Sequence, residues 1–269
     1  MIDDYVIYFL VLSFAGYIYE CIAMIIWTGK WDNRGFLFGP IIPIYGAGAL
    51  IGTIVFTYVL PDYSPLSVFL IGMFGSAVLE FVVHYYLEKI FHAYWWDYSP
   101  APFNIQGRIC LFASIGFGIA ALVIVYVINP VVIPIISGID PFIKHILALI
   151  IVILVTADTT LTVVTLSHFV DRINNAEQVI NEHMDVLVGH VLDESKGLNS
   201  KFYNAVDKVE ETKKRLIDDR IDRFAKSMSR LNHRYLNRIK KFTGNNSEKL
   251  NSILIKIKDR IAYNRDNER

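Results

Sequence analysis

The sequence predicts an all-α membrane protein with five transmembrane helices and a long helical tail. Hydrophobic residues make up 54% of its 269 residues. Only five of the 26 Lys and Arg residues come before residue 166, so the basic charge is concentrated in the remainder of the chain. The composition therefore divides the chain into a lipid-soluble domain, residues 1–165, and a water-soluble tail, residues 166–269.

Five apolar segments are long enough to be transmembrane helices. The hydrocarbon core of a bilayer is about 30 Å thick, so a spanning helix needs roughly 20 mostly apolar residues. Turn-forming Gly, Pro, Asn and Asp residues separate the segments, including a connection at residues 129–141 between the last two. The predicted spans run from Tyr5 to Trp27, Pro40 to Leu60, Leu66 to Tyr86, Ile109 to Ile128 and Phe142 to Thr165.

Basic residues predict the orientation of these spans. The first loop contains Lys30 and Arg34, and the third is flanked by Lys89 and Arg108, whereas the N-terminus and the second loop contain neither Lys nor Arg. Because cytoplasmic loops are enriched in Lys and Arg, we expect the N-terminus outside and the tail in the cytoplasm. The sequence thus predicts a multi-pass protein of the cell (cytoplasmic) membrane, with the lipid bilayer as its first partner.

Three acids lie within the predicted spans: Glu20, Glu80 and Asp158. Ionisable groups are costly in hydrocarbon and are therefore functional candidates, here roughly 14 Å inside the cytoplasmic boundary at 1.5 Å per residue. We expect Arg34 and Arg108 to be their partners, because Arg stays charged when buried. Such pairs either only join the helices or line a polar cavity open to the cytoplasm. Three acids against two arginines leave one acid for a proton, a cation or a substrate.

A loose parallel tandem repeat relates residues 5–60 to residues 66–128. Each copy presents an acid, Trp-Asp, Asn, adjacent Arg and Gly, and then an apolar helix. Transporters often place their site at the interface of such repeats. We therefore add four loop residues of the two copies to the binding candidates: Asn33, Trp96, Asp97 and Asn104. Four others are expected to shape the loops: Gly35, Gly39, Pro40 and Gly107.

A weaker pattern suggests a metal site. Glu80, His84 and Glu88 share one helical face at spacings of four residues and could hold a metal at the membrane edge. Such a site would suit a membrane-embedded enzyme acting on a lipid headgroup. However, no nucleophile is paired with a base, so we name no catalytic residue, the cofactor is left open, and an enzyme is not the favoured class.

Several motifs resemble a known family. They are Asn33 to Pro40 (NRGFLFGP), Pro43 to Gly46, Trp95 to Ser99, Pro102 to Ile105 and Gly107 to Leu111, together with Glu20 and Glu80. Over roughly residues 5–165 they resemble the bacterial putative ABC-transporter type IV family of CmpB-like permeases. The resemblance implies a permease. Because the sequence has no phosphate-binding loop, with Gly29-Lys30 followed by Trp31, ATP hydrolysis would need a separate ATPase subunit.

The tail is predicted to be helical and coiled-coil-like from Leu166 to Phe242, with a shorter helix from Ser247 to Asn264. Apolar residues recur there at spacings of three and four, which favours homo-oligomerisation through the tail. A basic stripe is expected to meet lipid headgroups or solvent, and nucleic acid is not the expected partner. Its members are Arg230, Arg234, Arg238, Lys240 and Lys241.

These observations favour a membrane transport protein with a polar intramembrane site open to the cytoplasm. Two alternatives remain open at this point. One is the lipid-headgroup enzyme, and the other is a membrane-anchored oligomeric scaffold or sensor, in which the spans only anchor the tail. The scaffold predicts that the loop motifs are dispensable and that the tail is not.

Overall fold

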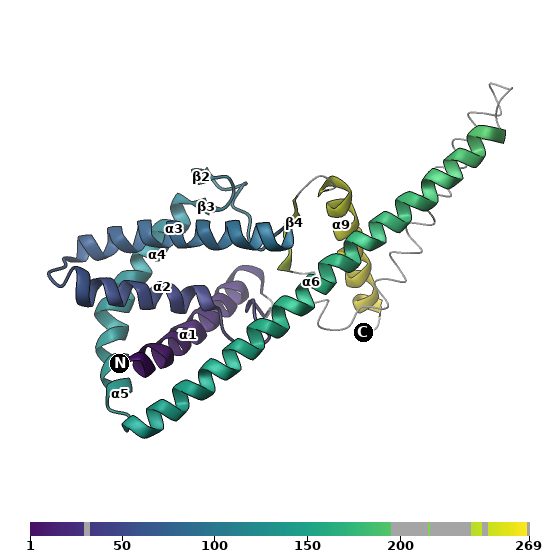
Figure 1. Ribbon diagram of the computed structural model, residues 1–269. Coiled ribbons are helices and arrows are strands. Elements are labelled where there is room, and N and C mark those ends of the chain that lie inside the picture. The colour runs from purple at the N-terminus through teal and green to yellow at the C-terminus, as the bar shows by residue number, and fades with distance from the viewer. Residues whose placement is uncertain (30–32, 195–214, 216–237, 244–246, 268–269) are drawn as a thin grey trace. The chain divides into compact units, whose positions relative to one another are not determined.

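The computed structural model describes residues 1–29, 33–194, 215, 238–243 and 247–267, and these residues are mostly helical (Figure 1). The chain forms two compact units. The first comprises Met1–Ile90 and Trp96–Thr165, and the second comprises Phe91–Trp95 and Leu166–Arg269.

Helices build most of the first unit, and the longest helix continues from it into the second. In chain order the elements are α1 (Ile2–Thr28), α2 (Pro43–Ile54), the π-helical turn η1 (Val55–Val59), α3 (Pro65–Phe91), β1 (Ala93–Tyr94), β2 (Asn104–Ile105), β3 (Ile109–Cys110), α4 (Leu111–Val123), the π-helical turn η2 (Ile124–Ile128), α5 (Asn129–Ser137), α6 (Pro141–Glu194), β4 (Lys241–Phe242) and α9 (Ser247–Asn267). The all-α prediction thus holds for most of the described chain but misses two short antiparallel strand pairs, β1–β4 and β2–β3.

Four segments of the described chain are long and apolar enough to cross a membrane, by length and composition. They are Ile2–Ile26, Pro65–Phe91, Leu111–Ser137 and Pro141–His168, and each is 25 to 28 residues long. The other predicted span appears as a shorter apolar helix, Pro43–Val59. At 1.5 Å per residue this helix is about 25 Å long, slightly less than the thickness of a hydrocarbon core.

The second predicted span begins later than expected, at Pro43 instead of Pro40. Pro43 stands at the first position of α2, where its missing N–H and fixed φ suit a helix start. The residue before a proline avoids the helical region, and Ile42 is accordingly extended, with φ −123° and ψ 98°. The chain before it therefore remains a loop.

The fourth predicted span continues further than expected. Residues 129–141 were predicted to be a connection, but α5 occupies Asn129–Ser137 and continues the helix from η2. Pro130 cannot donate a backbone N–H to the preceding turn, and the π-helical turn η2 lies directly before α5. Only residues 138–140 separate α5 from α6.

Helices α1 and α2 pack closely and run antiparallel. Gly46 lies against Ser13 and the backbone of Phe9, so any larger side chain at this position would overlap α1. Further along, the hydroxyl of Tyr8 contacts Thr53 Oγ1 at 2.9 Å. Small residues at a helix interface allow this close approach of the two backbones.

The contact between Tyr8 and Thr53 is part of a polar network that joins α1, α2 and α5. Tyr8 donates to Asn129 Oδ1 at 2.7 Å, and Asn129 Nδ2 donates to Thr53 Oγ1 at 3.1 Å. Buried apolar residues of the same three helices surround this network: Ile7, Leu12, Ala49 and Ile136. The hydrogen bonds satisfy polar groups that would otherwise be unpaired in an apolar environment.

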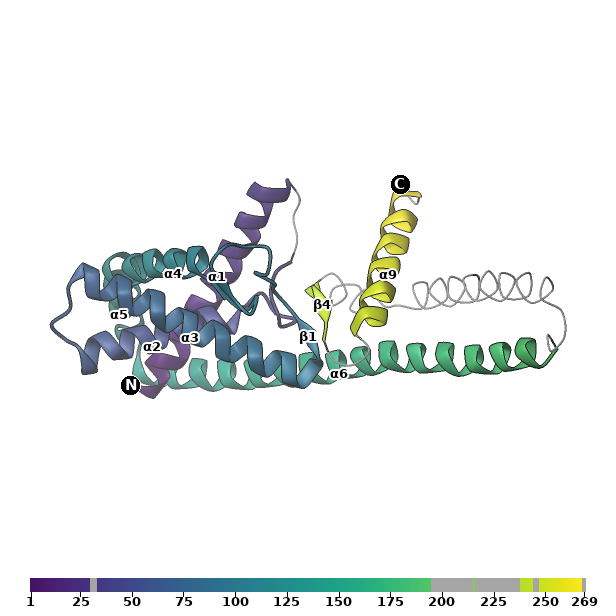
Figure 2. The same ribbon diagram turned by 90° about the horizontal axis from the view of Figure 1, so that it is seen from above.

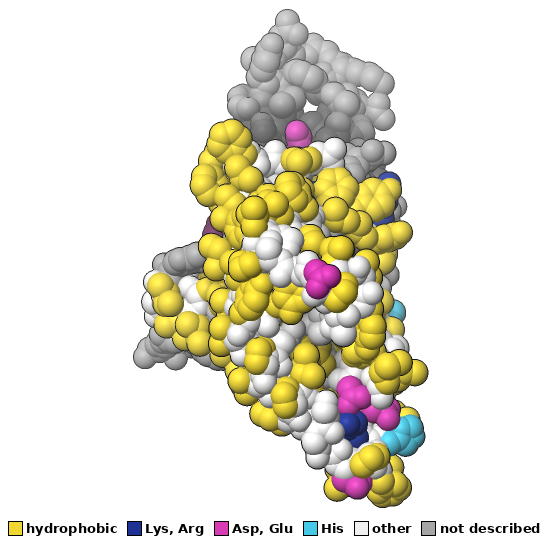
Figure 3. Space-filling model, turned by 90° about the vertical axis from the view of Figure 1, so that its left-hand side faces the viewer, with side chains coloured by type: hydrophobic (Ala, Val, Ile, Leu, Met, Phe, Trp, Pro, Cys, Tyr) yellow, Lys and Arg dark blue, Asp and Glu magenta, His cyan; other side chains and the backbone are white. Residues whose placement is uncertain are grey.

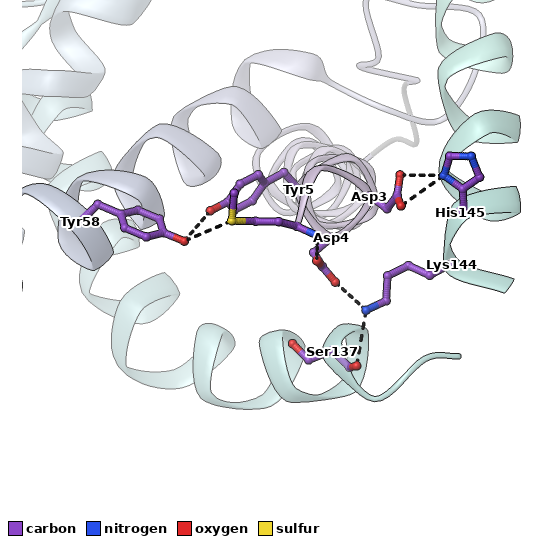
Figure 4. Close-up of polar contacts among 8 residues, drawn as sticks. Asp3, Asp4, Tyr5, Tyr58, Ser137, Lys144 and His145 are labelled. Atoms are coloured by element: carbon purple, nitrogen blue, oxygen red, sulfur yellow. Dashed lines mark hydrogen bonds and ion pairs between the residues drawn. The ribbon is translucent and has the colours of Figure 1, made fainter. Parts of the chain in front are cut away.

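Ion pairs join the beginnings of α1 and α6. Figure 4 shows Asp3 and Asp4 directed toward His145 and Lys144. Lys144 Nζ lies 2.7 Å from Asp4, and His145 Nδ1 lies 3.3 Å from Asp3. The first turns of these two helices therefore lie at the same end of the unit.

The exterior of the first unit is mainly apolar. Figure 3 shows hydrophobic side chains over much of the face that it presents, with a group of acidic, basic and His side chains at its lower edge and an isolated acidic side chain near its centre. Many large hydrophobic side chains on the spans are exposed, including Phe74, Val78, Ile153 and Leu154. Apolar surface of this extent is unusual for a soluble monomer and is typical of a surface that meets lipid.

In the second unit, a strand pair and a helix form a small module (Figure 2). Strand β1 pairs with β4, with Ala93 opposite Phe242 and Tyr94 opposite Lys241. Asn251 on α9 accepts from the Phe242 N–H at 2.6 Å and donates to its carbonyl at 3.1 Å. These bonds order the backbone of β4 against α9.

One face of α9 is buried. Leu250, Leu254 and Ile257 recur at helical spacing and are at most 6% exposed, whereas Ile255 on another face is 59% exposed. The helix begins at Ser247, where we expected it to begin, and ends at Asn267 instead of Asn264. This face gives the tail a core of its own.

The described part of the tail differs from the predicted long helix. The predicted helix does not continue to Phe242, because Lys241 and Phe242 form a strand with β1 and Lys241 lies over the Tyr94 ring at 4.5 Å. In the basic stripe, Arg230 and Arg234 lie outside the described residues, as does most of the predicted coiled coil. Helix α6 does extend the last span continuously to Glu194.

Candidate functional site

Glu20 on α1 has two partners in the structure. The Tyr45 hydroxyl of α2 donates to its Oε1 at 2.6 Å, and Arg34 Nε lies 3.6 Å from its Oε2. The predicted pairing of Arg34 with an intramembrane acid is therefore present. Because all these side chains are only partly exposed, the arginine offsets the charge of a half-buried carboxylate.

Asp158 on α6 is held by backbone instead of by an arginine. The N–H groups of Phe38 and Gly39 donate to its two oxygens at 2.8 Å each, and Thr162 Oγ1 lies 3.3 Å from Oδ1. A Cβ on Gly39 would lie 2.8 Å from Oδ2, so this loop approaches the carboxylate as closely as glycine allows. Asp158 thus fixes the loop that precedes α2. Pro40, the next residue, is exposed.

Glu80 on α3 is the most buried of the three acids, at 6% exposed. The hydroxyl of Tyr98 donates to its Oε1 at 3.3 Å, whereas its buried Oε2 has no hydrogen-bond partner in the described part of the chain. The expected partner, Arg108, does not reach it. Burial raises the pKa of the Tyr98 hydroxyl above its usual range, and the carboxylates of Glu80 and Glu20 act in the same direction.

Arg108 pairs with Glu88 instead of Glu80, so the predicted pairing was wrong. Arg108 Nη2 lies 2.6 Å from Glu88 Oε2, its Nη1 contacts Gln106 Oε1, and its guanidinium lies over the Phe81 ring at 5.1 Å. Glu88 lies two helical turns beyond Glu80, nearer the end of α3, where the loop that carries Arg108 returns to the helix.

Trp96 and His84 form hydrogen bonds that hold the loop between α3 and α4 against α3. Trp96 Nε1 donates to the carbonyl of Arg108 at 2.9 Å, and His84 Nε2 lies 3.2 Å from the carbonyl of Trp96. The two rings meet edge to face, with centroids 5.1 Å apart. Trp96 therefore has a positioning role in this structure.

The predicted metal ligands are directed to separate partners. Glu80 meets Tyr98, His84 meets the backbone of Trp96, and Glu88 meets Arg108. Among the described residues, no group of three His, Cys, Asp or Glu side chains could hold a metal ion. The spacing along one helical face is correct, but the returning loop engages each side chain separately.

Asp97, Asn104 and Gly107 shape the loop between α3 and α4. Asp97 Oδ1 accepts the N–H of Ser99 at 2.9 Å, and Asn104 Oδ1 accepts the N–H of Gly107 at 3.0 Å. Gly107 has φ +69°, and a Cβ there would meet the Asp97 carboxylate and Ser99 Oγ. Only glycine fits this left-handed position easily. The structure assigns all three residues to loop geometry.

The loop between α1 and α2 contains a similar hydrogen bond from a glycine N–H to an asparagine side chain. Asn33 Oδ1 accepts the N–H of Gly35 at 3.2 Å, as Asn104 does from Gly107. In both loops, an Asn side chain thus closes a turn onto the following glycine. This is the role in which Asx side chains are common in loops.

Two of the acids each accept a hydrogen bond from a tyrosine, and both acids act electrostatically on Tyr98. These four side chains form the acid–tyrosine cluster: Glu20, Tyr45, Glu80 and Tyr98. Sequence analysis proposed the two acids but missed both tyrosines, because tyrosine near a membrane interface is also explained by its amphipathic ring. The signal that could have identified Tyr45 is its place inside an apolar helix, where a hydroxyl needs a partner.

A separate cavity of about 290 Å³ lies near the Tyr8–Asn129 network. Thr53, Thr57 and Asn129 contribute its polar atoms, and no charged residue lines it. None of the predicted site residues lines this cavity.

Comparison with protein families gives one match. The family described as "Putative ABC-transporter type IV" matches residues 7–163, which is more than half of the chain. This range includes all three intramembrane acids and both loops described above. No match was found among curated proteins or among solved structures. The chain thus belongs to the putative ABC-transporter type IV family.

Proposed function

We propose that this protein is the membrane-spanning component of a transport system, with a polar site that opens to the cytoplasm beside the acid–tyrosine cluster. The observation that carries the proposal is the family match over residues 7–163, the part of the chain that contains most of the membrane-length helices and the acids Glu20, Glu80 and Asp158. Because the sequence contains no phosphate-binding loop, a separate ATPase subunit would supply any ATP hydrolysis.

The proposal includes five spans. Helix Pro43–Val59 is the second of them, and the loop before it completes the crossing of the bilayer. The antiparallel packing of α1 and α2 supports this arrangement, because α2 then returns the chain to the side on which α1 begins. With five spans and the Lys and Arg distribution, the N-terminus lies outside and the tail lies in the cytoplasm.

Cysteine labelling tests this topology. The native Cys21 and Cys110 are buried, so an introduced exposed cysteine is expected to react first. In intact cells, a membrane-impermeant maleimide should label Asp62→Cys and should label Thr28→Cys and Ser252→Cys only after the cells are opened. Labelling of Thr28→Cys and Asp62→Cys from the same side would rule out a membrane-spanning α2.

A ligand screen tests the site. The full chain, purified in detergent, is heated in the presence of monovalent cations, divalent cations, inorganic phosphate, nucleotides or lipid headgroups. A ligand that binds the folded state raises its apparent melting temperature by mass action. We expect this increase to vanish in Glu20→Gln and Glu80→Gln and to persist in Tyr58→Phe, a matched control whose hydroxyl bonds Tyr5 instead.

The outcomes separate the candidate functions. A ligand shift that survives in both glutamate variants would remove the acid–tyrosine cluster from the site. If no ligand shifts the wild-type protein and both variants unfold at markedly lower temperature, the acids are structural. The scaffold or sensor would then replace the transport protein as the best explanation.

A further inference from the structure

Glu80 differs from the other intramembrane acids in its partners. Glu20 has Arg34 and Tyr45, and Asp158 has two backbone N–H groups. Glu80 has one long hydrogen bond from Tyr98, and no basic side chain within the described residues forms an ion pair with it. Its second oxygen, Oε2, is buried without a partner.

The surrounding charges do not offset a negative charge on Glu80. Arg34 is engaged by Glu20, and Arg108 is engaged by Glu88. The titratable groups that act on the Tyr98 hydroxyl beside it are Glu20 and Cys110, as well as Glu80 itself.

The helices around Glu80 add no other counter-charge. On α2, the hydroxyl of Tyr45 is occupied by Glu20. On α3 itself, the imidazole of His84, one turn away, contacts the carbonyl of Trp96. Helix α4, Leu111–Val123, contains no titratable side chain.

This arrangement favours a neutral side chain. An isolated ionised carboxylate is very costly in a low-dielectric interior, and a nearby second carboxylate adds repulsion. A protonated carboxylic acid avoids both costs, and its carbonyl oxygen still accepts the hydrogen bond from Tyr98. Acidic side chains inside a membrane also form the proton relays of pumps and transporters.

We propose that Glu80 binds a proton on Oε2 while Tyr98 donates to Oε1, and that it releases this proton to water. On release, the O–H bond breaks, the electron pair stays on Glu80 and the proton passes to water. The proposal rests on the transport function proposed above and names the proton as an ion that the site binds.

Infrared spectroscopy of the full chain in lipid nanodiscs tests this proposal without any substrate. At neutral pH, the wild-type protein should show the carbonyl-stretch band of a protonated carboxylic acid, which shifts to lower frequency in D₂O. We expect Glu80→Gln to lack this band and Glu20→Gln, the matched control, to retain it. No such band in the wild type, or a band that persists in Glu80→Gln, would overturn the proposal.

A second variant keeps the test decisive if Glu80→Gln does not fold. Tyr98→Phe retains the acid and its proton but removes the donor to Oε1, so the band should remain and move to higher frequency. A band at unchanged frequency would show that the protonated acid is not Glu80. A ligand-dependent gain in melting temperature without any such band would leave the transport proposal standing and remove this one.

Discussion

Two segments of the chain present similar residue types in nearly the same order, but their acids and arginines pair differently in the structure. In the first, Arg34 returns to Glu20 at 3.6 Å, and Tyr45 donates to the same carboxylate. The first acid thus has both a counter-charge and a short hydrogen bond.

In the second segment, Arg108 pairs with Glu88 and not with Glu80. A longer loop separates Glu80 from Arg108, and the loop returns to α3 at Glu88, beyond the acid that sequence order would select. Glu80 keeps only the hydrogen bond from Tyr98. The difference teaches that a repeated residue order does not by itself fix electrostatic pairing, because loop length decides which acid the arginine reaches.

The largest expected contrast between the two segments concerns their glycines. Gly107→Ala should lower the free energy of unfolding by about 2–4 kcal/mol, because φ is positive and a Cβ would meet Asp97 and Ser99. Gly35→Ala should cost less than about 1 kcal/mol, since its contacts begin at 3.2 Å and its φ is not positive. Thermal or denaturant unfolding in detergent measures both, and equal losses would contradict the contrast.

The arginines give the next largest effect. Arg108→Ala leaves Glu88, 20% exposed, without a cation and should lower the free energy of unfolding by about 2–3 kcal/mol. Arg34→Ala should cost about 1 kcal/mol, because its pair with Glu20 is longer and more exposed. Adding Glu88→Gln to Arg108→Ala should recover part of the loss in the same unfolding measurement. No recovery would mean that Arg108 acts through packing alone.

The smallest contrast concerns the tyrosines of the acid–tyrosine cluster. Tyr45→Phe removes a 2.6 Å hydrogen bond to the acid paired with Arg34 and should cost about 1.5–3 kcal/mol. Tyr98→Phe removes a 3.3 Å bond to Glu80 and should cost about 0.5–1 kcal/mol. Unfolding of both variants in one detergent gives the comparison. A larger loss for Tyr98→Phe would indicate that Glu80 is the ionised acid of the two.

Some predicted binding residues form loop contacts in the structure, and their part in binding stays a prediction. Trp96, Asp97 and Asn104 were expected near a ligand, but their polar atoms bond to the loop backbone and to Ser99. Their residue types suit both roles, because amides, carboxylates and indoles bind backbone groups as readily as ligands. Sequence spacing alone could not distinguish loop structure from recognition.

The sequence by itself determined the apolar segments, the uneven distribution of Lys and Arg, and the three acids inside the spans, because each depends on residue type along one stretch of chain. It also left one acid more than the arginines could match. Only the tertiary structure decided that Arg108 pairs with Glu88, so that both Glu80 and Asp158 have no arginine, and that backbone N–H groups hold Asp158 instead. Pairing is a matter of distance in space, and here it depends on where two loops return to their helices, since a carboxylate interacts strongly only with groups within a few ångströms.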